Sequence, residues 1–287
     1  MITIGILNLT EHLEETIDGF QSSLEIQGIE PDYIYHNAHG KEQRLISLAR
    51  KLVKEKPALI FACSTPSALA LKQVMTDKIV PVVYAPVFNP HLSGLIDPTN
   101  RVLRHFTGVS GMVNPFLKIE MIEKIFPDLK KITLFYDPED TLSLFDYEKL
   151  SHETANKGLV SEGIPLVEGV LESEKLSPIH GPVLLVFSLK IEDNLEKWIG
   201  FTHETSLPVV ASSKRGAVLG CLAGLYADHY QLGEIAAQKA KKILDGTLAS
   251  AIEISYPEGC KIVCNYMTAT TMNFEFPLEI SMKGDIC

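Results

Sequence analysis

The chain has 287 residues, 46% of them hydrophobic and 22% charged, a composition ordinary for a globular protein of one large or two medium domains. Its formal net charge of -10 argues against nucleic-acid binding, which needs a basic face. No apolar run approaches the roughly 20 residues of a membrane-spanning helix.

Strand-like and helix-like segments alternate from the start of the chain. In the first part, short apolar runs predict strands at 2–7, 33–35, 58–62 and 80–85. After the third of these runs, Ser64 or Thr65 can cap a helix that opens with Pro66. The unpaired N–H groups and the positive dipole end of such a helix favour an anion, such as a carboxylate. The simpler interpretation is that the serine only caps the helix.

The same alternation restarts after Gly108. Asn114 and Pro115 begin a helix, and Asp228 caps a last amphipathic helix. Further strands are predicted at 132–136, 183–187 and 209–211. Repeated β-α units with continuous apolar strands predict an α/β fold of two Rossmann-like lobes with parallel sheets. We expect lobe 1 at 1–110 plus 228–252 and lobe 2 at 111–227 plus 253–287.

Ligands of open α/β sheets bind at the carboxyl ends of the strands, and two facing lobes would hold a ligand in the cleft between them. The residues at the predicted strand ends are mostly small, polar and uncharged. They suit hydrogen bonding to a small ligand better than acid–base chemistry, although each is also a common turn or cap residue. These candidates are Asn8, Thr10, Ser64, Thr65, Phe88, Asn89, Ser110, Tyr136, Ser188 and Ser212.

The cysteines and histidines predict neither a disulfide framework nor a metal site. Five cysteines are an odd number and are widely scattered. Cys260 and Cys264 lie four apart, which is no standard zinc spacing, and no third ligand accompanies His36 and His39. We expect no metal and no cofactor.

Six segments in a fixed order carry a resemblance to a known family. They are Cys63-Ser-Thr-Pro-Ser67, Pro81-Val-Val-Tyr-Ala-Pro-Val-Phe-Asn-Pro90, Thr107-Gly-Val-Ser110, Tyr136-Asp-Pro138, Leu207-Pro-Val-Val-Ala-Ser212 and Asp228-His-Tyr-Gln-Leu-Gly233. With this order and spacing, the chain resembles the ABC-transporter substrate-binding proteins of the TrpX-like family almost end to end.

The resemblance implies a periplasmic-binding-protein type I fold, with two lobes joined by three crossovers near 110–114, 224–228 and 250–258. It implies a solute-binding component that captures a small ligand by lobe closure and delivers it to an inner-membrane ABC permease, without catalysis. Characterised members are associated with aromatic amino acids, for which Phe88 and Tyr136 are candidate flanking groups. We expect a monomer.

Several acidic residues of the family pattern have neutral or basic counterparts here. The positions are Asn89, Gly111, Ser188, Ser213 and Lys214. A buried ligand ammonium needs an acidic or carbonyl partner, because an unpaired buried charge is very costly. Asp140 and Asp193 are the remaining candidate partners. We therefore hypothesise a ligand less cationic than a free amino acid: an aromatic or apolar carboxylate, or an uncharged compound.

Two alternatives stay open. Cys63 and Cys221 each lie beside small residues, one in each lobe, and could form the acid–base thiol pair of a cofactor-independent amino-acid racemase. A ligand-sensing domain of the same fold is the other alternative. The chain opens on a strand-like segment, which fits a periplasmic or lipoprotein chain without its export signal, and also a cytoplasmic protein.

Overall fold

The computed structural model describes residues 2–76, 80–97, 99–166, 179 and 181–287. The chain forms two compact units. Unit 1 comprises Met1–Met112 with Ala227–Glu258, and unit 2 comprises Val113–Tyr226 with Gly259–Cys287. The chain therefore passes from one unit to the other three times.

Unit 1 is built on a five-stranded parallel sheet in the order β2-β1-β3-β4-β5. Its strands are β1 (Thr3–Asn8), β2 (Asp32–Asn37), β3 (Leu59–Cys63), β4 (Val82–Val87) and β5 (Phe106–Ser110). All five residues of β3 are buried, as expected for a strand covered on both faces. Because the strands are parallel, their carboxyl ends meet at one edge of the sheet.

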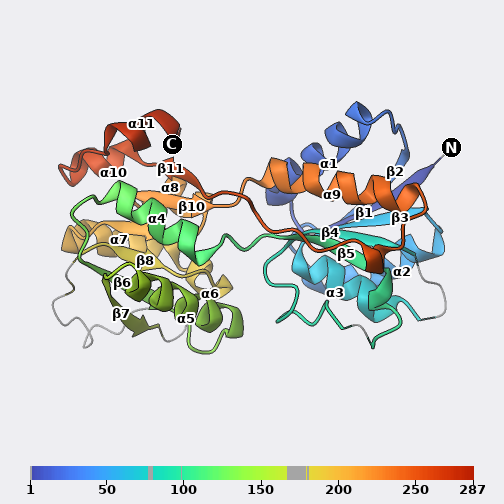
Figure 1. Ribbon diagram of the computed structural model, residues 1–287, viewed down its shortest axis with the longest axis horizontal. Helices are drawn as coiled ribbons and strands as arrows, with labels where there is room; N and C mark the ends of the chain where they lie inside the picture. Colours follow the sequence, from blue (N-terminus) through green and yellow to red (C-terminus); the bar gives the residue numbers. More distant parts are fainter. Residues whose placement is uncertain (1, 77–79, 98, 167–178, 180) are drawn as a thin grey trace. The chain divides into compact units, whose positions relative to one another are not determined.

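Helices cover both faces of this sheet (Figure 1). They are α1 (Glu14–Ile26), α2 (Leu45–Lys54), α3 (Thr65–Val74) and α9 (His229–Leu244), with short 3₁₀ turns at Glu11–Leu13, Glu42–Arg44, Leu103–His105 and Ala249–Ala251. Side chains of β3 alternate between the layers: Phe61 stacks on Phe20 of α1, with ring centroids 4.1 Å apart, while Ile60 packs in the cluster that holds α2 and α3.

The segment after α9 stays with unit 1. The Thr107 hydroxyl of β5 donates to the Ile252 carbonyl at 2.9 Å, and Ser255 forms a parallel bridge with Val109. These contacts tie the chain to β5 before it leaves unit 1 for the last time.

Helices α1 and α9 lie against each other at two glycines. A Cβ on Gly19 would lie 2.1 Å from the Tyr230 carbonyl oxygen, and one on Gly233 would lie 2.0 Å from the Thr16 carbonyl oxygen. Both distances are far below van der Waals contact, so only glycine permits this approach. The contact joins the first helix of the chain to one more than 200 residues later.

Unit 2 is built on a seven-stranded sheet in the order β12-β11-β10-β9-β8-β6-β7. The strands are β6 (Lys131–Tyr136), β7 (Val160–Pro165), β8 (Val183–Leu185), β9 (Val209–Ala211), β10 (Ala223–Tyr226), β11 (Lys261–Cys264) and β12 (Asp285–Ile286). Strands β10 and β11 pair antiparallel, so the sheet is not wholly parallel. Strand β11 belongs to the segment that returns from unit 1.

The helices of unit 2 cover its sheet with two separate apolar clusters. They are α4 (Pro115–Ile125), α5 (Thr141–Asn156), α6 (Leu189–Asp193), α7 (Leu195–Thr205), α8 (Lys214–Leu219), α10 (Tyr266–Thr271) and α11 (Leu278–Lys283). One cluster joins α4, α5, α10 and α11 to the sheet, and the other joins α6 and α7 to it. Between α4 and α5, Lys118 and Asp146 form a buried ion pair at 2.6 Å.

Replacing Gly233 by alanine should destabilise the protein. Alanine gains about 1 kcal/mol of helix propensity, but its Cβ would force α9 away from α1, and overpacking of this kind typically costs about 1–3 kcal/mol. We expect a net loss of up to about 2 kcal/mol in the free energy of unfolding, measured in urea. Gly200→Ala in α7 is the matched control, because it lies in a helix and no atom lies within 4 Å of its added Cβ. Equal stability of the two variants would contradict the close helix contact.

Candidate functional site

The carboxyl edge of the unit 1 sheet gathers polar side chains from three neighbouring strands. Asn8 ends β1 and lies beside Asn37 of β2 on one side and Cys63 of β3 on the other. The helices that follow β1 and β3 begin at this edge, with Glu14 and Thr65 as their first residues. The edge therefore combines amide, hydroxyl and carboxylate groups.

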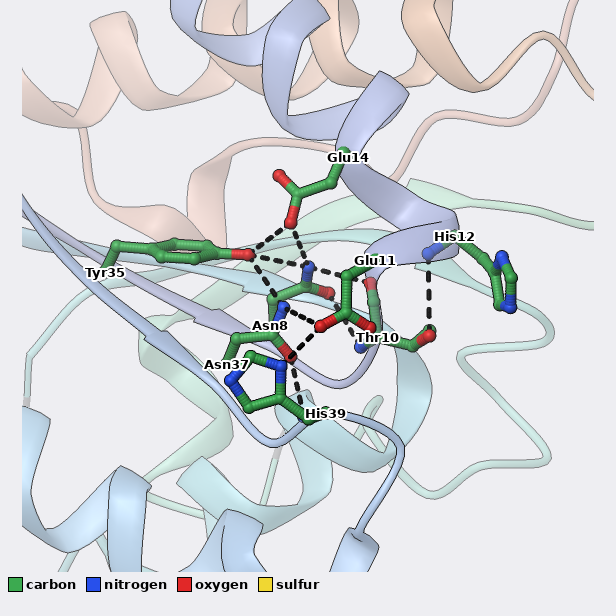
Figure 2. A network of polar contacts seen from close by, with 8 residues as sticks. All are labelled: Asn8, Thr10, Glu11, His12, Glu14, Tyr35, Asn37 and His39. Carbon is green, nitrogen blue, oxygen red and sulfur yellow. Dashed lines mark hydrogen bonds and ion pairs between the residues drawn. The ribbon is translucent and has the colours of Figure 1, made fainter.

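A hydrogen-bond network surrounds Asn8 (Figure 2). The buried Asn8 amide donates from Nδ2 to the Thr10 carbonyl at 2.9 Å, to the Tyr35 hydroxyl at 3.1 Å and to Glu14 Oε1 at 3.3 Å. The Tyr35 hydroxyl in turn donates to the same Glu14 oxygen through a short hydrogen bond. The network holds the Glu14 carboxylate over the end of β1.

Tyr35 donates a hydrogen bond to the Glu14 carboxylate. Burial, together with the hydrogen bond to Glu14, raises the pKa of Tyr35 to about 12. The hydroxyl therefore stays protonated at neutral pH and acts as a hydrogen-bond donor to Glu14.

A second carboxylate continues the network. Glu11 pairs with His39 through Nδ1 and accepts a hydrogen bond of 3.4 Å from Asn37 Nδ2. The same Asn37 amide donates to the Tyr35 hydroxyl at 3.0 Å, which links the two halves. Glu11 and His39 are about 60% exposed, so their ion pair is screened by water and contributes little to stability.

The junction of β3 and α3 is strained. Ser64 adopts φ 124° and ψ 160°, a backbone region that is almost restricted to glycine. Its hydroxyl accepts from the Ser67 N–H at 3.1 Å and donates to the Ser67 hydroxyl at 2.8 Å. Ser64 is thus the N-cap of α3, with Pro66 in the first turn, as the sequence predicts. Its side chain is used for capping.

Thr65, beside it, has a different role. Its Oγ1 accepts from the Phe88 N–H at 3.2 Å, and its own hydroxyl proton has no acceptor among the described residues. Thr65 is only half-buried, so this donor is available to a ligand.

The loop after β4 completes the unit 1 edge. The buried Ser110 hydroxyl donates to the Phe88 carbonyl at 3.0 Å and accepts from the Met112 N–H at 3.1 Å. Asn89 Oδ1 accepts from the His91 and Leu92 N–H groups, at 3.2 Å and 3.1 Å. The structure therefore brings Thr65, Phe88 and Ser110 into one hydrogen-bonded group, while Thr10 joins Asn8 at the other end of the edge.

In unit 2, the predicted residues follow the carboxyl ends of β6, β8 and β9. Tyr136 stacks on Tyr147 of α5, with ring centroids 4.0 Å apart. Ser188 caps α6 through the Ile191 N–H at 3.1 Å, and Asp140 caps α5 through the Leu142 N–H at 2.9 Å. Among the described residues, no hydrogen bond joins these three groups to one another.

The last two predicted groups of unit 2 differ in exposure. The Ser212 hydroxyl oxygen, after β9, is buried and has no partner among the described residues. Asp193, the candidate ammonium partner in α6, is exposed.

Sequence reasoning missed several members of the site. Glu14 and Tyr35 were not predicted, because Glu14 lies in the first turn of a helix and Tyr35 lies within a strand. The strand end at Asn37 was the available signal, since β2 is the neighbour of β1. In unit 2, Asp137 follows β6 directly and is only 1% exposed. In the sequence, Asp137 stands out only as part of the segment Tyr136-Asp-Pro138.

The two thiols of the racemase alternative are both buried. Burial raises the pKa of Cys63 well above its usual value and raises that of Cys221 to about 12. A thiol that abstracts a proton needs the opposite shift. Among the described residues, no group of three metal-ligating side chains comes together, and no helix has the length and apolarity to cross a membrane.

A surface cavity of about 570 Å³ lies at the opposite edge of the unit 2 sheet. It is lined by Lys131, Pro182 and Pro208, at the amino ends of β6, β8 and β9, and by the rings of Phe126 and Phe274. It contains none of the predicted site residues.

The family model described as ABC transporter substrate binding protein matches residues 3–285. The chain belongs to this family. A curated relative of this substrate-binding protein is the tyrosine-binding protein of Clostridioides difficile (strain R20291), with 27% identity over 95% of this chain and 81% of the relative.

Solved structures show the same fold. The ligand-free, open structure of a substrate-binding protein with adhesive properties from Clostridium difficile has a TM-score of 0.84 at 23% identity, covering 100% of this chain and 99% of that one. An ABC domain from Streptococcus pneumonia in complex with L-Trp has a TM-score of 0.75 at 19% identity, covering 99% and 100%. The substrate-binding protein therefore has the expected α/β fold of the periplasmic-binding-protein type I class.

Iodoacetamide should distinguish the buried thiols from the exposed one. At pH 8 we expect Cys287, which is exposed, to be modified first, while Cys63 and Cys221 stay unmodified in the native protein because their raised pKa values keep them protonated. Peptide mass spectrometry measures each site, and unfolding in urea is the control that should release all five cysteines. Rapid native modification of Cys63 or Cys221 would restore the racemase alternative.

Proposed function

We propose that this substrate-binding protein captures a small organic ligand for import by an ABC permease. The ligand has an aromatic or apolar body and a carboxylate, as in an aromatic amino acid or a related acid. The curated relative is named for tyrosine, and one structural neighbour holds L-Trp, which supports an aromatic ligand. We infer that the protein works outside the cytoplasm, as a monomer, and without catalysis or cofactor.

The start of α3 is the observation that carries this proposal. The helix presents its positive dipole end and the spare proton of Thr65 at the carboxyl edge of the unit 1 sheet. The strained Ser64 backbone fixes the turn that presents them. A carboxylate is the group that such a helix start favours, and the neighbouring Phe88 is a candidate for flanking an apolar body.

The other predicted residues fit secondary roles. Asn89, Ser110, Ser188 and Ser212 are candidates for orienting hydrogen bonds, and Tyr136 for an aromatic contact from unit 2. Closure of the two lobes around the ligand stays a prediction.

A thermal-shift screen tests the proposed ligand class. The panel contains the aromatic amino acids, their deaminated acids and common nucleosides, and hits are confirmed by calorimetry. A ligand that binds only the native state stabilises it, by about 2.7 kcal/mol at a ligand concentration of a hundred times Kd. The melting temperature rises as a result. We expect shifts with aromatic compounds that carry a carboxylate. Shifts confined to nucleosides would overturn the proposed ligand class.

Thr65→Val should weaken binding of the carboxylate compounds. Valine keeps the shape of threonine but removes the whole hydroxyl, both its spare proton and the acceptor of the Phe88 N–H. An unpaired buried acceptor on the ligand costs about 1–3 kcal/mol. Calorimetric Kd values are compared with those of Thr270→Val, whose hydroxyl bonds within α10 in unit 2. We expect the control to bind as the unmodified protein does, and an unchanged Kd for Thr65→Val would remove the residue from the site.

A further inference from the structure

Ser110, the last residue of β5, joins three segments of unit 1. The residue is fully buried. Its hydroxyl donates to the Phe88 carbonyl at 3.0 Å and accepts from the Met112 N–H at 3.1 Å. Its own N–H donates to the Ser255 carbonyl at 2.8 Å. A single serine therefore fastens the loop after β4, the segment after β5 and the segment after α9 to one another.

Two of these segments lead out of unit 1. Met112 is the last residue of unit 1 before the first passage to unit 2, and Ser255 lies just before the third passage. The N–H of Gly111, next to Met112, donates to the Val87 carbonyl at 2.9 Å. The first and third passages are thus anchored to β4 and β5 where they begin.

The remaining segment leads to the start of α3. The Phe88 N–H donates to Thr65 Oγ1 at 3.2 Å, and the Phe88 carbonyl accepts from Ser110. An unbroken series of hydrogen bonds therefore runs from Thr65 through Phe88 and Ser110 to Met112. Thr65 is the residue whose hydroxyl proton is assigned to the ligand under the proposed function.

A ligand can act on this series through Thr65. A carboxylate that accepts the Thr65 proton makes the same hydroxyl oxygen a stronger acceptor for the Phe88 N–H, because hydrogen bonds in series polarise one another. The loop that carries Phe88 is then held more firmly, and Ser110 connects that loop to two passages. Residues that join two lobes are those that absorb the rotation when the lobes close.

A second hydroxyl of β5 reaches the third passage without this connection. Thr107 is also buried, and its hydroxyl donates to the Ile252 carbonyl at 2.9 Å. Among the described residues, no hydrogen bond joins the Thr107 side chain to Phe88 or Thr65. The two hydroxyls therefore anchor neighbouring parts of one segment, and within the described chain the hydroxyl of Ser110 is the one that also meets the ligand-site loop.

We propose that Ser110 is a positioning residue that connects ligand binding at Thr65 to the first and third passages between the units. The inference rests on the proposed function and extends it, because it names the chain segments that become more ordered when the ligand binds. It places Ser110 behind the ligand site, where its hydroxyl proton is used by the Phe88 carbonyl.

A double-mutant cycle in ligand affinity tests the connection. Calorimetry measures Kd for L-tyrosine, L-tryptophan and their deaminated acids with the unmodified protein, Thr65→Val, Ser110→Ala and the double variant. We expect Ser110→Ala to weaken Kd at least fivefold, because the loop beside Thr65 loses its anchor. The loss caused by Thr65→Val should be at least threefold smaller when Ser110 is already replaced.

Thr107→Val is the matched control, because it removes one buried hydroxyl from the same strand. We expect it to lower stability against urea as Ser110→Ala does, and to change Kd less than twofold. Combined with Thr65→Val, it should leave the loss caused by that variant unchanged.

Amide-resolved hydrogen exchange gives a second readout that leaves Ser110 in place. In the unmodified protein, saturating probe should slow exchange of the Ser110 and Met112 N–H groups. In unliganded Thr65→Val, both should exchange faster than in the unmodified protein, because the Phe88 N–H has lost its acceptor. The Val183 N–H, bonded within the unit 2 sheet, is the control and should not change. If Ser110→Ala does not fold, this measurement decides alone.

The outcomes separate the inference from the proposed function. Independent effects of Thr65→Val and Ser110→Ala on Kd, or unchanged Met112 exchange in Thr65→Val, would overturn the role of Ser110 and leave the ligand site intact. If the unmodified protein binds none of the probes, the proposed ligand class is wrong. Exchange in unliganded Thr65→Val then decides on the connection: faster exchange at Met112 supports it, and unchanged exchange overturns it.

Discussion

The contact between α1 and α9 is the constraint on which unit 1 depends. The chain leaves unit 1 after β5, folds through most of unit 2, and returns to place α9 against the first helix. Glycines at 19 and 233 let the two backbones meet, and Ile252 and Ser255 then fasten the next segment to β5. One of the helices that cover the unit 1 sheet therefore comes from the part of the chain that follows most of unit 2. Two of the three passages between the units follow from the packing of α9 in unit 1, and the third brings β11 to the unit 2 sheet.

The parallel strands place the functional groups. Each strand of unit 1 ends at the same edge, where a capped helix or a tight loop begins, so a side chain that caps also lies at the carboxyl edge, where we propose the ligand site. Ser64 and Ser188 show this double position, since both cap the helix that follows their strand. Capping uses these side chains, whereas the hydroxyl proton of Thr65 has no acceptor among the described residues.

The sequence predicts where helices and strands begin better than it predicts which of them lie side by side. Pro66 and Asp228 mark helix starts that the structure confirms, because caps act within one turn. The network of Asn8, Glu14 and Tyr35 was not predictable in the same way, because it depends on which strands are neighbours and in which register. The burial of Asp137 and the antiparallel pairing of β10 with β11 also arise from long-range packing, which local patterns do not contain.

Two unfavourable features of the free protein occur at the sheet edges. The Ser64 backbone occupies a region that costs of order 1–3 kcal/mol for residues other than glycine, and the buried Asp137 carboxyl accepts a single hydrogen bond. Folding alone favours neither, since glycine would relax the first and asparagine the second. Under the proposed function, the strained turn at Ser64 presents the Thr65 donor and the start of α3 to a ligand carboxylate. Under the same proposal, ligand binding offsets the conformational cost of that turn.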